Sequence, residues 1–124
     1  MILYSDLSEQ IIAAAIEVHK HTGAGLLESS YQAMLCHELR LRGIPFRVQV
    51  ELPIEYKGIL LDTGYRLDLI IDEKIVLELK SVESVLAVFE AQLMTYLKLS
   101  HYRVGLLINF NVPKLVDGII RRVI

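Results

Sequence analysis

Apolar and polar residues alternate with a helical period in the first part of the chain and with a strand period after it. Up to Arg42, apolar residues recur every three or four positions, which is typical of helices with one buried face. One helix is predicted from about Glu9 to His21, with Ser8 as its N-cap. A second helix is predicted from Gly25 to about Arg42, where Gly43 provides a C-terminal stop.

From Pro45 the pattern becomes that of β-strands. Residues 45–52 alternate apolar and polar side chains, which predicts a strand with one solvated face. A short hairpin is predicted next, with Ile54–Tyr56 and Leu60–Asp62 on either side of a turn at Lys57-Gly58.

Two strongly apolar runs, Arg66–Ile71 and Ile75–Lys80, follow, with only Asp72-Glu73-Lys74 between them. This pattern predicts a β-hairpin whose strands are buried on both faces. The runs nevertheless contain Asp68, Glu78 and Lys80. Ionised side chains inside a buried sheet are costly unless they pair with one another or bind a metal ion. The hairpin is therefore the first candidate for a functional site.

Helical spacing returns in Val85–Leu99, and a buried strand is predicted at Arg103–Phe110. A strand, a helix of this length and a further strand form a parallel crossover, which should be right-handed. The tail, Gly118–Ile124, has the residues of an edge strand. Taken in order, these elements predict an α/β fold with a mixed central sheet flanked by helices.

The composition is that of a stable globular protein. The chain has 124 residues, 53% of them hydrophobic, and a mean hydropathy of +0.43, so one domain over residues 1–124 is expected. No apolar run approaches the roughly 18 residues of a transmembrane helix, and the N-terminus lacks the features of a signal peptide. With a single cysteine, Cys36, we expect a reduced, cytoplasmic protein without a membrane partner.

The overall charge argues against one class of nucleic-acid binder. A formal net charge of −2 and a pI near 6.1 argue against an open, sequence-independent basic surface, although they allow a local basic groove. Two sets of arginines could contact phosphate, but solvated surface charge is the expected role of both. They are Arg40, Arg42 and Arg47 around Gly43, and Arg121 with Arg122 near the end of the chain.

The three charges of the central hairpin can form one constellation. Alternation along a strand places Glu78 and Lys80 on the same face. Asp68 precedes Glu78 by ten residues, so a turn at residues 72–74 brings the two acids to neighbouring positions on adjoining strands. A slip of one residue in the register would separate them. The constellation therefore depends on the geometry of the turn.

Two converging carboxylates repel one another unless a proton or a cation lies between them. Mg²⁺ prefers oxygen ligands of this kind and keeps several of its waters. An ion held there could polarise a phosphoryl oxygen and lower the pKa of a bound water. Lys80 could orient that water or neutralise charge that develops on the phosphate. The alternative is purely structural, with Lys80 paired to Glu78 or Asp68 at the end of its strand.

Several further segments resemble one protein family. Gly25, Glu28 and Tyr31 stand in the sequence Gly-Leu-Leu-Glu-Ser-Ser-Tyr, and matching stretches follow at residues 65–69, 76–82, 91–97 and 105–110. In these motifs and their order the chain resembles the GxxExxY proteins, a family placed in the PD-(D/E)XK nuclease superfamily. The resemblance runs over nearly the whole chain and implies the restriction-endonuclease-like core of that superfamily, αβββαβ.

The resemblance also implies roles for individual residues. Asp68 and Glu78 fall on the metal-binding acids of the superfamily and Lys80 on its catalytic lysine, with Mg²⁺ or Mn²⁺ as the cofactor. Glu28 falls on an additional acid that many members use near the metal. From the sequence alone, Glu28 has the alternative role of a partner for the dipole of its own helix. Leu67 stands where the proline in the name of the superfamily would be.

Two aromatic residues and a glutamine complete the candidate site. Gln92 and Tyr96 resemble the Gln-x₃-Tyr motif that supports the site in exonuclease-type branches. As residues i and i+4 of one helix, they share a face. Tyr31 is a further candidate for supporting the site or contacting the substrate, and its alternative role is a ring at the edge of the core.

Two functions are consistent with these residues. The first is a Mg²⁺-dependent nuclease that hydrolyses phosphodiester bonds in DNA. The second is a catalytically silent module of the same fold that binds nucleic acid or a protein partner, and a structural ion-pair network is a third interpretation of the charges. An exposed C-terminal edge strand would also permit a homodimer.

Overall fold

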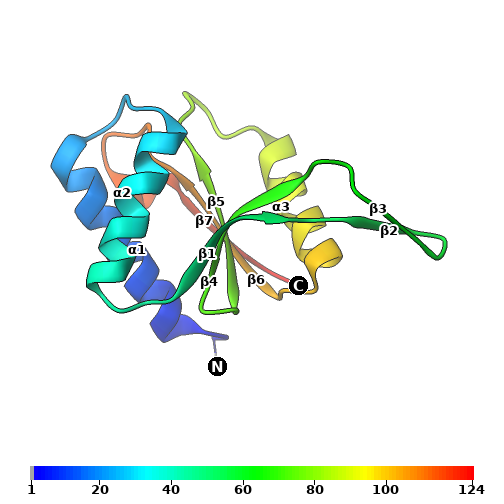
Figure 1. The fold of residues 1–124 in the computed structure, drawn as a ribbon. Helices are drawn as coiled ribbons and strands as arrows, with labels where there is room; N and C mark the ends of the chain where they lie inside the picture. Colours follow the sequence, from blue (N-terminus) through cyan, green and yellow to red (C-terminus); the bar gives the residue numbers. More distant parts are fainter. Residues whose placement is uncertain (1) are drawn as a thin grey trace.

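The computed structural model describes residues 2–124, which form a central sheet with helices on both faces (Figure 1). The helices are α1 (Ser5–Thr22), α2 (Glu28–Leu41), α3 (Ala87–Ser100) and the short 3₁₀ helix η1 (Leu115–Gly118). The strands are β1 (Phe46–Glu51), β2 (Ile54–Tyr56), β3 (Ile59–Leu61), β4 (Arg66–Ile71), β5 (Ile75–Lys80), β6 (Val104–Asn109) and β7 (Ile119–Val123). The bounds of β4 and β5 are those that the sequence predicts for the buried hairpin.

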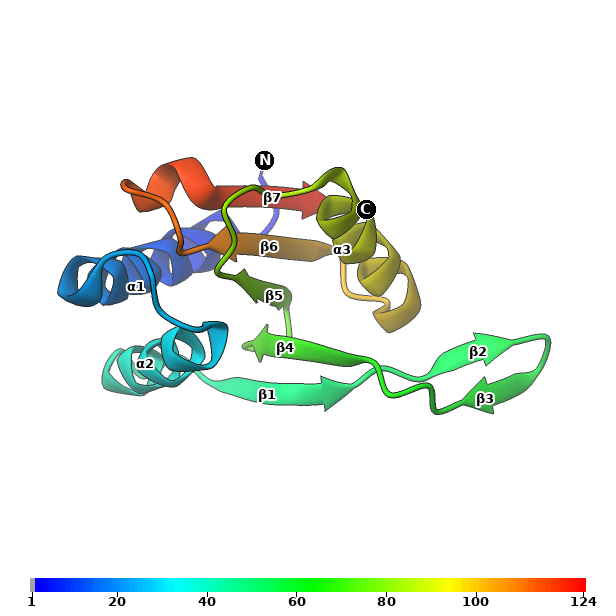
Figure 2. The same ribbon diagram turned by 90° about the horizontal axis from the view of Figure 1, so that it is seen from above.

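The main sheet is mixed, as predicted. Its five strands lie in the order β1-β4-β5-β6-β7, and every neighbouring pair is antiparallel except β5 and β6 (Figure 2). The parallel pair is connected through α3, which forms the predicted crossover. With β2 and β3 set aside, the elements from α2 to β6 follow the order αβββαβ. The predicted fold class is therefore confirmed.

Two hydrophobic cores lie on opposite faces of this sheet. On one face, α1 and α2 pack against residues that include Leu69 and Leu77. On the other face, α3 packs against residues that include Ile70 and Val76. Figure 1 shows α1 and α2 to the left of the strands and α3 to the right. None of the helices within residues 2–124 is long and apolar enough to cross a membrane.

β2 and β3 form a separate two-stranded ribbon that extends away from the body of the molecule (Figure 2). The sequence predicts this hairpin, although the structure begins its second strand at Ile59 rather than at Leu60. Tyr56, Ile59 and Leu60 are exposed on the ribbon. The charged residues of the candidate hairpin, Asp68, Glu78 and Lys80, lie on β4 and β5 of the main sheet and not on this ribbon.

The first helix begins earlier than predicted. It starts at Ser5, so Ser8 lies inside the helix with its side chain buried and does not act as the N-cap. The buried stripe continues towards the N-terminus, because Leu7 packs against the same core as Ile11. Packing of this stripe extends the helix past a residue type that commonly begins one.

Candidate functional site

The pairing of β4 with β5 stops at Asp68 and Glu78. The antiparallel register runs from Ile71↔Ile75 to Leu69↔Leu77, and the next positions are occupied by the two acids. There, the backbone N–H of Asp68 donates to Glu78 Oε1 at 3.3 Å, and the backbone N–H of Leu79 donates to Asp68 Oδ2 at 2.8 Å. Side-chain carboxylates thus take the place of carbonyl groups as acceptors. This arrangement brings the two acids together at the end of the ladder.

The direction of β4 changes at the same point. Leu67 and Leu69 are two residues apart and should face the same side of a regular strand. Leu67 instead packs in the core beneath α3, whereas Leu69 packs in the core beneath α1 and α2. The reversal takes place at Asp68, and a local irregularity of this kind re-aims a side chain. Asp68 can therefore bind the backbone of the neighbouring strand.

Glu78 is buried, with only 7% of its surface exposed. Burial, the charge of Asp68 and a side-chain hydrogen bond to Asp68 raise the pKa of Glu78 from 4.5 to about 9. The hydrogen bond from the backbone of Asp68 and the charge of Lys80 act in the opposite direction but are weaker. Without a cation, Glu78 therefore holds a proton at neutral pH.

Lys80 lies two residues beyond Glu78 on β5, and its side chain points towards α3. Its Nζ atom is 4.5 Å from the centroid of the Phe89 ring, within range of a cation–π interaction. Lys80 is partly exposed, whereas Leu79 beside it is buried. The ammonium group thus lies over the Phe89 ring, and its charge lowers the pKa of Glu78.

α3 supplies the predicted glutamine and tyrosine to the same region. Gln92 Nε2 donates a hydrogen bond of 2.8 Å to the hydroxyl oxygen of Tyr96. Burial raises the pKa of Tyr96, and the charge of Glu78 and, less strongly, that of Asp68 raise it further. The hydroxyl therefore lies within electrostatic range of both acids. The ring also packs edge-on against Tyr65, with centroids 6.0 Å apart.

Glu28 approaches from the opposite side, at the first residue of α2. Glu28 and Asp68 both line a cavity of about 460 Å³, together with Ser29, Gln32, Gln49 and Leu79. Glu28 is exposed and stands at the rim of this cavity. Within residues 2–124, no three His, Cys, Asp or Glu side chains are placed closely enough to form a metal site by themselves. The structure brings Asp68 and Glu78 together and leaves Glu28 across the cavity from Asp68.

Tyr31 lies within the core, next to the loop that precedes Glu28. It is fully buried and stacks on Phe110 with ring centroids 4.4 Å apart. Its hydroxyl donates to the carbonyl of Gly23 at 2.6 Å and accepts from the backbone N–H of Leu26 at 3.2 Å. Tyr31 therefore fixes the loop that precedes Glu28. In this loop Gly25 has a φ of +101°, a conformation that is strained for any other residue.

Two polar residues outside the predicted set hold the end of β5. Ser81 Oγ donates to the carbonyl of Leu26 at 2.6 Å, which ties the loop before Glu28 to the residue after Lys80. Asn109 donates to the carbonyl of Val82 at 2.9 Å and accepts from its N–H at 3.1 Å. The same side-chain oxygen of Asn109 also accepts from the backbone N–H of Asn111 at 3.2 Å, which caps the turn after β6. For Ser81, the only signal in the sequence is its position directly after Lys80.

The chemistry of these residues fits a divalent metal ion. Asp68 and Glu78 offer carboxylate oxygens, the ligands that Mg²⁺ and Mn²⁺ prefer. In the absence of a cation, Glu78 ionises only well above neutral pH. A bound cation would therefore favour the ionised form of Glu78 beside Asp68. A site with two protein carboxylates suits an ion that keeps several waters.

The sequence model of the PD-(D/E)XK nuclease superfamily matches residues 5–123. The chain belongs to this superfamily. The resemblance in the sequence is thus confirmed at the level of the superfamily, whereas the narrower GxxExxY assignment stays a prediction. Members typically use divalent metal ions, which agrees with the oxygen-rich pair in the structure. Comparisons with curated proteins and with solved structures gave no match.

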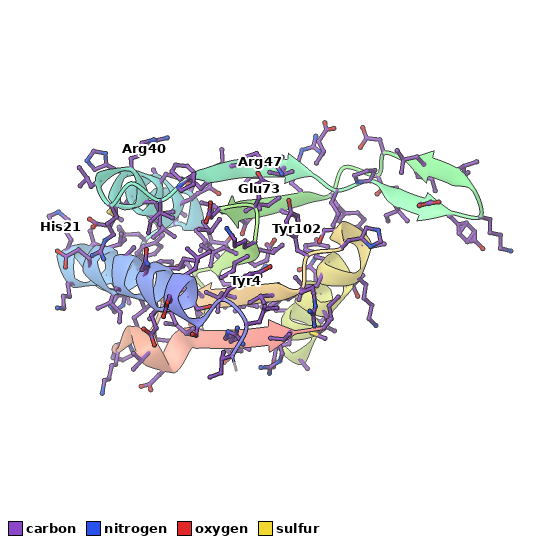
Figure 3. The ribbon with its side chains drawn as sticks, turned by 90° about the horizontal axis from the view of Figure 1, so that it is seen from below. Tyr4, His21, Arg40, Arg47, Glu73 and Tyr102 are labelled. Carbon is purple, nitrogen blue, oxygen red and sulfur yellow. The ribbon has the colours of Figure 1, made fainter. Side chains whose placement is uncertain are left out.

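In this PD-(D/E)XK chain, the arginines singled out in the sequence all have protein partners, and Arg121 donates to the carbonyl of Leu3. Arg47 forms two hydrogen bonds with Glu73, of 2.5 and 2.9 Å, and Tyr102 donates to the same carboxylate at 2.8 Å. Figure 3 shows Arg47, Glu73 and Tyr102 near one another at the β4–β5 turn.

The other arginines contact residues elsewhere in the chain. Arg42 pairs with Glu38, Arg122 pairs with Glu90, and Arg40 lies over the ring of Phe46. These contacts agree with the expected role as surface charge.

Proposed function

We propose that this chain is a Mg²⁺-dependent nuclease that hydrolyses phosphodiester bonds in DNA. The observation that carries the proposal is the end of the β4–β5 ladder, where two carboxylates meet and Lys80 follows on the same strand. A purely structural ion pair would not require the pairing of β4 with β5 to stop, and two adjoining carboxylates would repel one another. Membership of a nuclease superfamily supports the same conclusion.

Asp68 and Glu78 would hold the metal ion, with Mn²⁺ as a substitute for Mg²⁺. Glu28 would complete the site from the rim of the cavity that it shares with Asp68. When bound, the ion supplies a Lewis acid for a phosphoryl oxygen and lowers the pKa of a coordinated water. Both carboxylates are held by the neighbouring strand, because Glu78 accepts from the backbone N–H of Asp68 and Asp68 accepts from that of Leu79.

Lys80 would provide the positive charge that the carboxylates lack. Its ammonium group rests against the Phe89 ring and the residue remains partly exposed, so it would be accessible to a phosphate or a water. There it can orient the attacking water or stabilise negative charge that develops on the phosphate. Gln92 and Tyr96 would support the site from α3, and Tyr31 would do so through the loop before Glu28.

The test is cleavage of plasmid DNA, linear duplex DNA and single-stranded oligonucleotides in the presence of Mg²⁺. We expect cleavage by the wild type, and its loss in Asp68→Ala, in Lys80→Ala and in EDTA. The control variants Asp117→Ala and Lys20→Ala change exposed residues of the same type far along the chain and should retain activity. Cleavage that survives both Asp68→Ala and Lys80→Ala would refute the assignment.

A second candidate is a silent module that binds nucleic acid or a protein partner without cleaving. The observation that favours it is the separation of Glu28 from the Asp68–Glu78 pair, which leaves two clustered acids rather than three in residues 2–124. This alternative predicts that the wild type binds DNA, cleaves none of the three substrates and retains its affinity in Lys80→Ala.

The edge strand β7 offers a route to a homodimer. It pairs with β6 on one side, and its other side has no strand partner within residues 2–124. We propose pairing of two β7 strands as the contact. Light scattering of the wild type and of Arg121→Pro, which removes a backbone donor from β7, would test it, with a monomeric wild type as the contradicting result.

A further inference from the structure

Gln49 adopts an unusual backbone conformation in the middle of β1. Its φ is +47°, in the left-handed region that glycine and asparagine occupy most readily. Its neighbours pair regularly with β4, Val48 with Leu69 and Val50 with Leu67, so that Gln49 stands across from Asp68. A glycine or asparagine would hold this backbone with less strain. The presence of a glutamine therefore indicates a role for its longer side chain.

The side chain of Gln49 reaches across to α2. Its Nε2 donates a hydrogen bond of 2.9 Å to Gln32 Oε1, and Gln32 lies one turn after Glu28. Both glutamines line the cavity of about 460 Å³ that contains Glu28 and Asp68. That bond uses the Gln49 nitrogen and the Gln32 oxygen, whereas the side-chain oxygen of Gln49 and the side-chain nitrogen of Gln32 have no hydrogen-bond partner within residues 2–124. The oxygen of Gln49 is thus left as a free acceptor and the NH2 group of Gln32 as a free donor group, beside Asp68 in the same cavity.

The chemistry of this wall of the cavity restricts its ligand. Two acids, Glu28 and Asp68, already line the cavity, so a further bare anion is disfavoured there. Neutral amides offer a paired donor and acceptor, the pattern that is complementary to the edge of a nucleobase and to sugar hydroxyls. A volume of about 460 Å³ lies in the range of small-ligand pockets and suits one nucleotide, whereas a base pair held within a duplex cannot enter it.

We propose that Gln32 and Gln49 bind an unpaired nucleotide next to the scissile phosphate, so that single-stranded nucleic acid is the preferred substrate class. The position relative to the scissile phosphate rests on the proposed nuclease function. The binding of an unpaired nucleotide does not, because it follows from the amide pair and the cavity. The two claims can therefore fail separately.

The test measures the binding of one oligonucleotide, as a single strand and as a duplex, by fluorescence anisotropy. The protein carries Lys80→Ala and is kept in Mg²⁺, so that cleavage does not interfere. We expect Gln32→Ala and Gln49→Gly each to weaken single-strand binding by about tenfold, with little effect on the duplex. Gln49→Gly removes the amide but suits the backbone, so its thermal stability should not fall. The control, Gln10→Ala, alters an exposed glutamine of α1.

Unchanged single-strand affinity in both variants, or an equal loss for single strand and duplex, would overturn the proposal. In the enzyme with Lys80 intact, the same variants should raise KM and leave kcat near its wild-type value. If the wild type cleaves no substrate but the variants still lose single-strand binding, the nucleotide site stands and the nuclease function fails. If the wild type cleaves and the variants match it in KM, the nucleotide site alone fails.

Discussion

The backbone N–H of Asp68 donates to the carboxylate of Glu78 across the end of the β4–β5 ladder, at 3.3 Å. Each of the two acids is therefore fixed by the strand that carries the other, because Asp68 in turn accepts from the backbone of Leu79. In a buried sheet, this arrangement places two carboxylates where one must be protonated or share a cation. The predictions below follow from that relationship.

The stability of the metal-free protein should fall as the pH rises. The pKa of Glu78 in the folded protein is about 9, above its ordinary value of 4.5. A raised pKa contributes stability that is complete below about 4.5 and is lost as the pH rises through about 9. The free energy of unfolding should therefore decline across this window, by at most about 1.4 kcal/mol per pH unit. Urea unfolding in EDTA at several pH values measures it.

The control for this prediction is Glu78→Gln, which keeps the shape of the side chain and removes the titration. Its free energy of unfolding should depend less on pH than that of the wild type between pH 5 and 9. Parallel curves for the two proteins would show that Glu78 ionises normally in the folded state. Saturating Mg²⁺ should also flatten the wild-type curve, since the ion replaces the proton.

Two substitutions of Asp68 should distinguish its role as a hydrogen-bond acceptor from the effect of its charge on stability. Asp68→Ala removes the acceptor for the N–H of the buried Leu79 and should cost about 1–3 kcal/mol of stability. Asp68→Asn keeps an oxygen in that place and should cost less, although it removes the charge. Equal destabilisation by the two substitutions, measured by urea unfolding in EDTA, would contradict the hydrogen-bonding role.

Tyr31→Phe should loosen the loop before Glu28 while leaving the core filled. The substitution keeps the stacking on Phe110 and removes the hydroxyl that joins Gly23 to Leu26. We expect a loss of about 1 kcal/mol of stability and faster hydrogen exchange at residues 23–28. Tyr56→Phe, on the exposed ribbon, is the matched control. Unchanged exchange in the loop would mean that the hydroxyl does not hold it.

Much of the fold could be predicted because its signals are local. Two apolar runs with a polar turn between them specify β4 and β5, and the helical spacing that follows specifies α3 and the parallel crossover. The lysine on the face of Glu78 also follows from the period of a strand. The departure of β2 and β3 from the main sheet could not be predicted, because a hairpin pattern does not reveal which strands it joins.

The finer features of the site depend on contacts between distant segments. Regular alternation places Leu67 and Leu69 on one face, and the reversal at Asp68 arises only when β4 pairs with β1 and β5. The left-handed backbone of Gln49 has no signal in its residue type. The start of α1 at Ser5 likewise depends on packing of Leu7 against the core, which outweighs the capping preference of Ser8.

The most direct test of the account is calorimetric titration of the protein with Mg²⁺, and with Mn²⁺, in buffers of different ionisation enthalpy at pH 7. We predict binding of the ion with release of about one proton, because Glu78 must ionise to coordinate it. Asp68→Asn and Glu78→Gln should lose this binding, and Asp117→Asn should keep it. A wild type with no measurable affinity for either ion, or with affinity that survives Asp68→Asn and Glu78→Gln, would contradict the proposed metal centre.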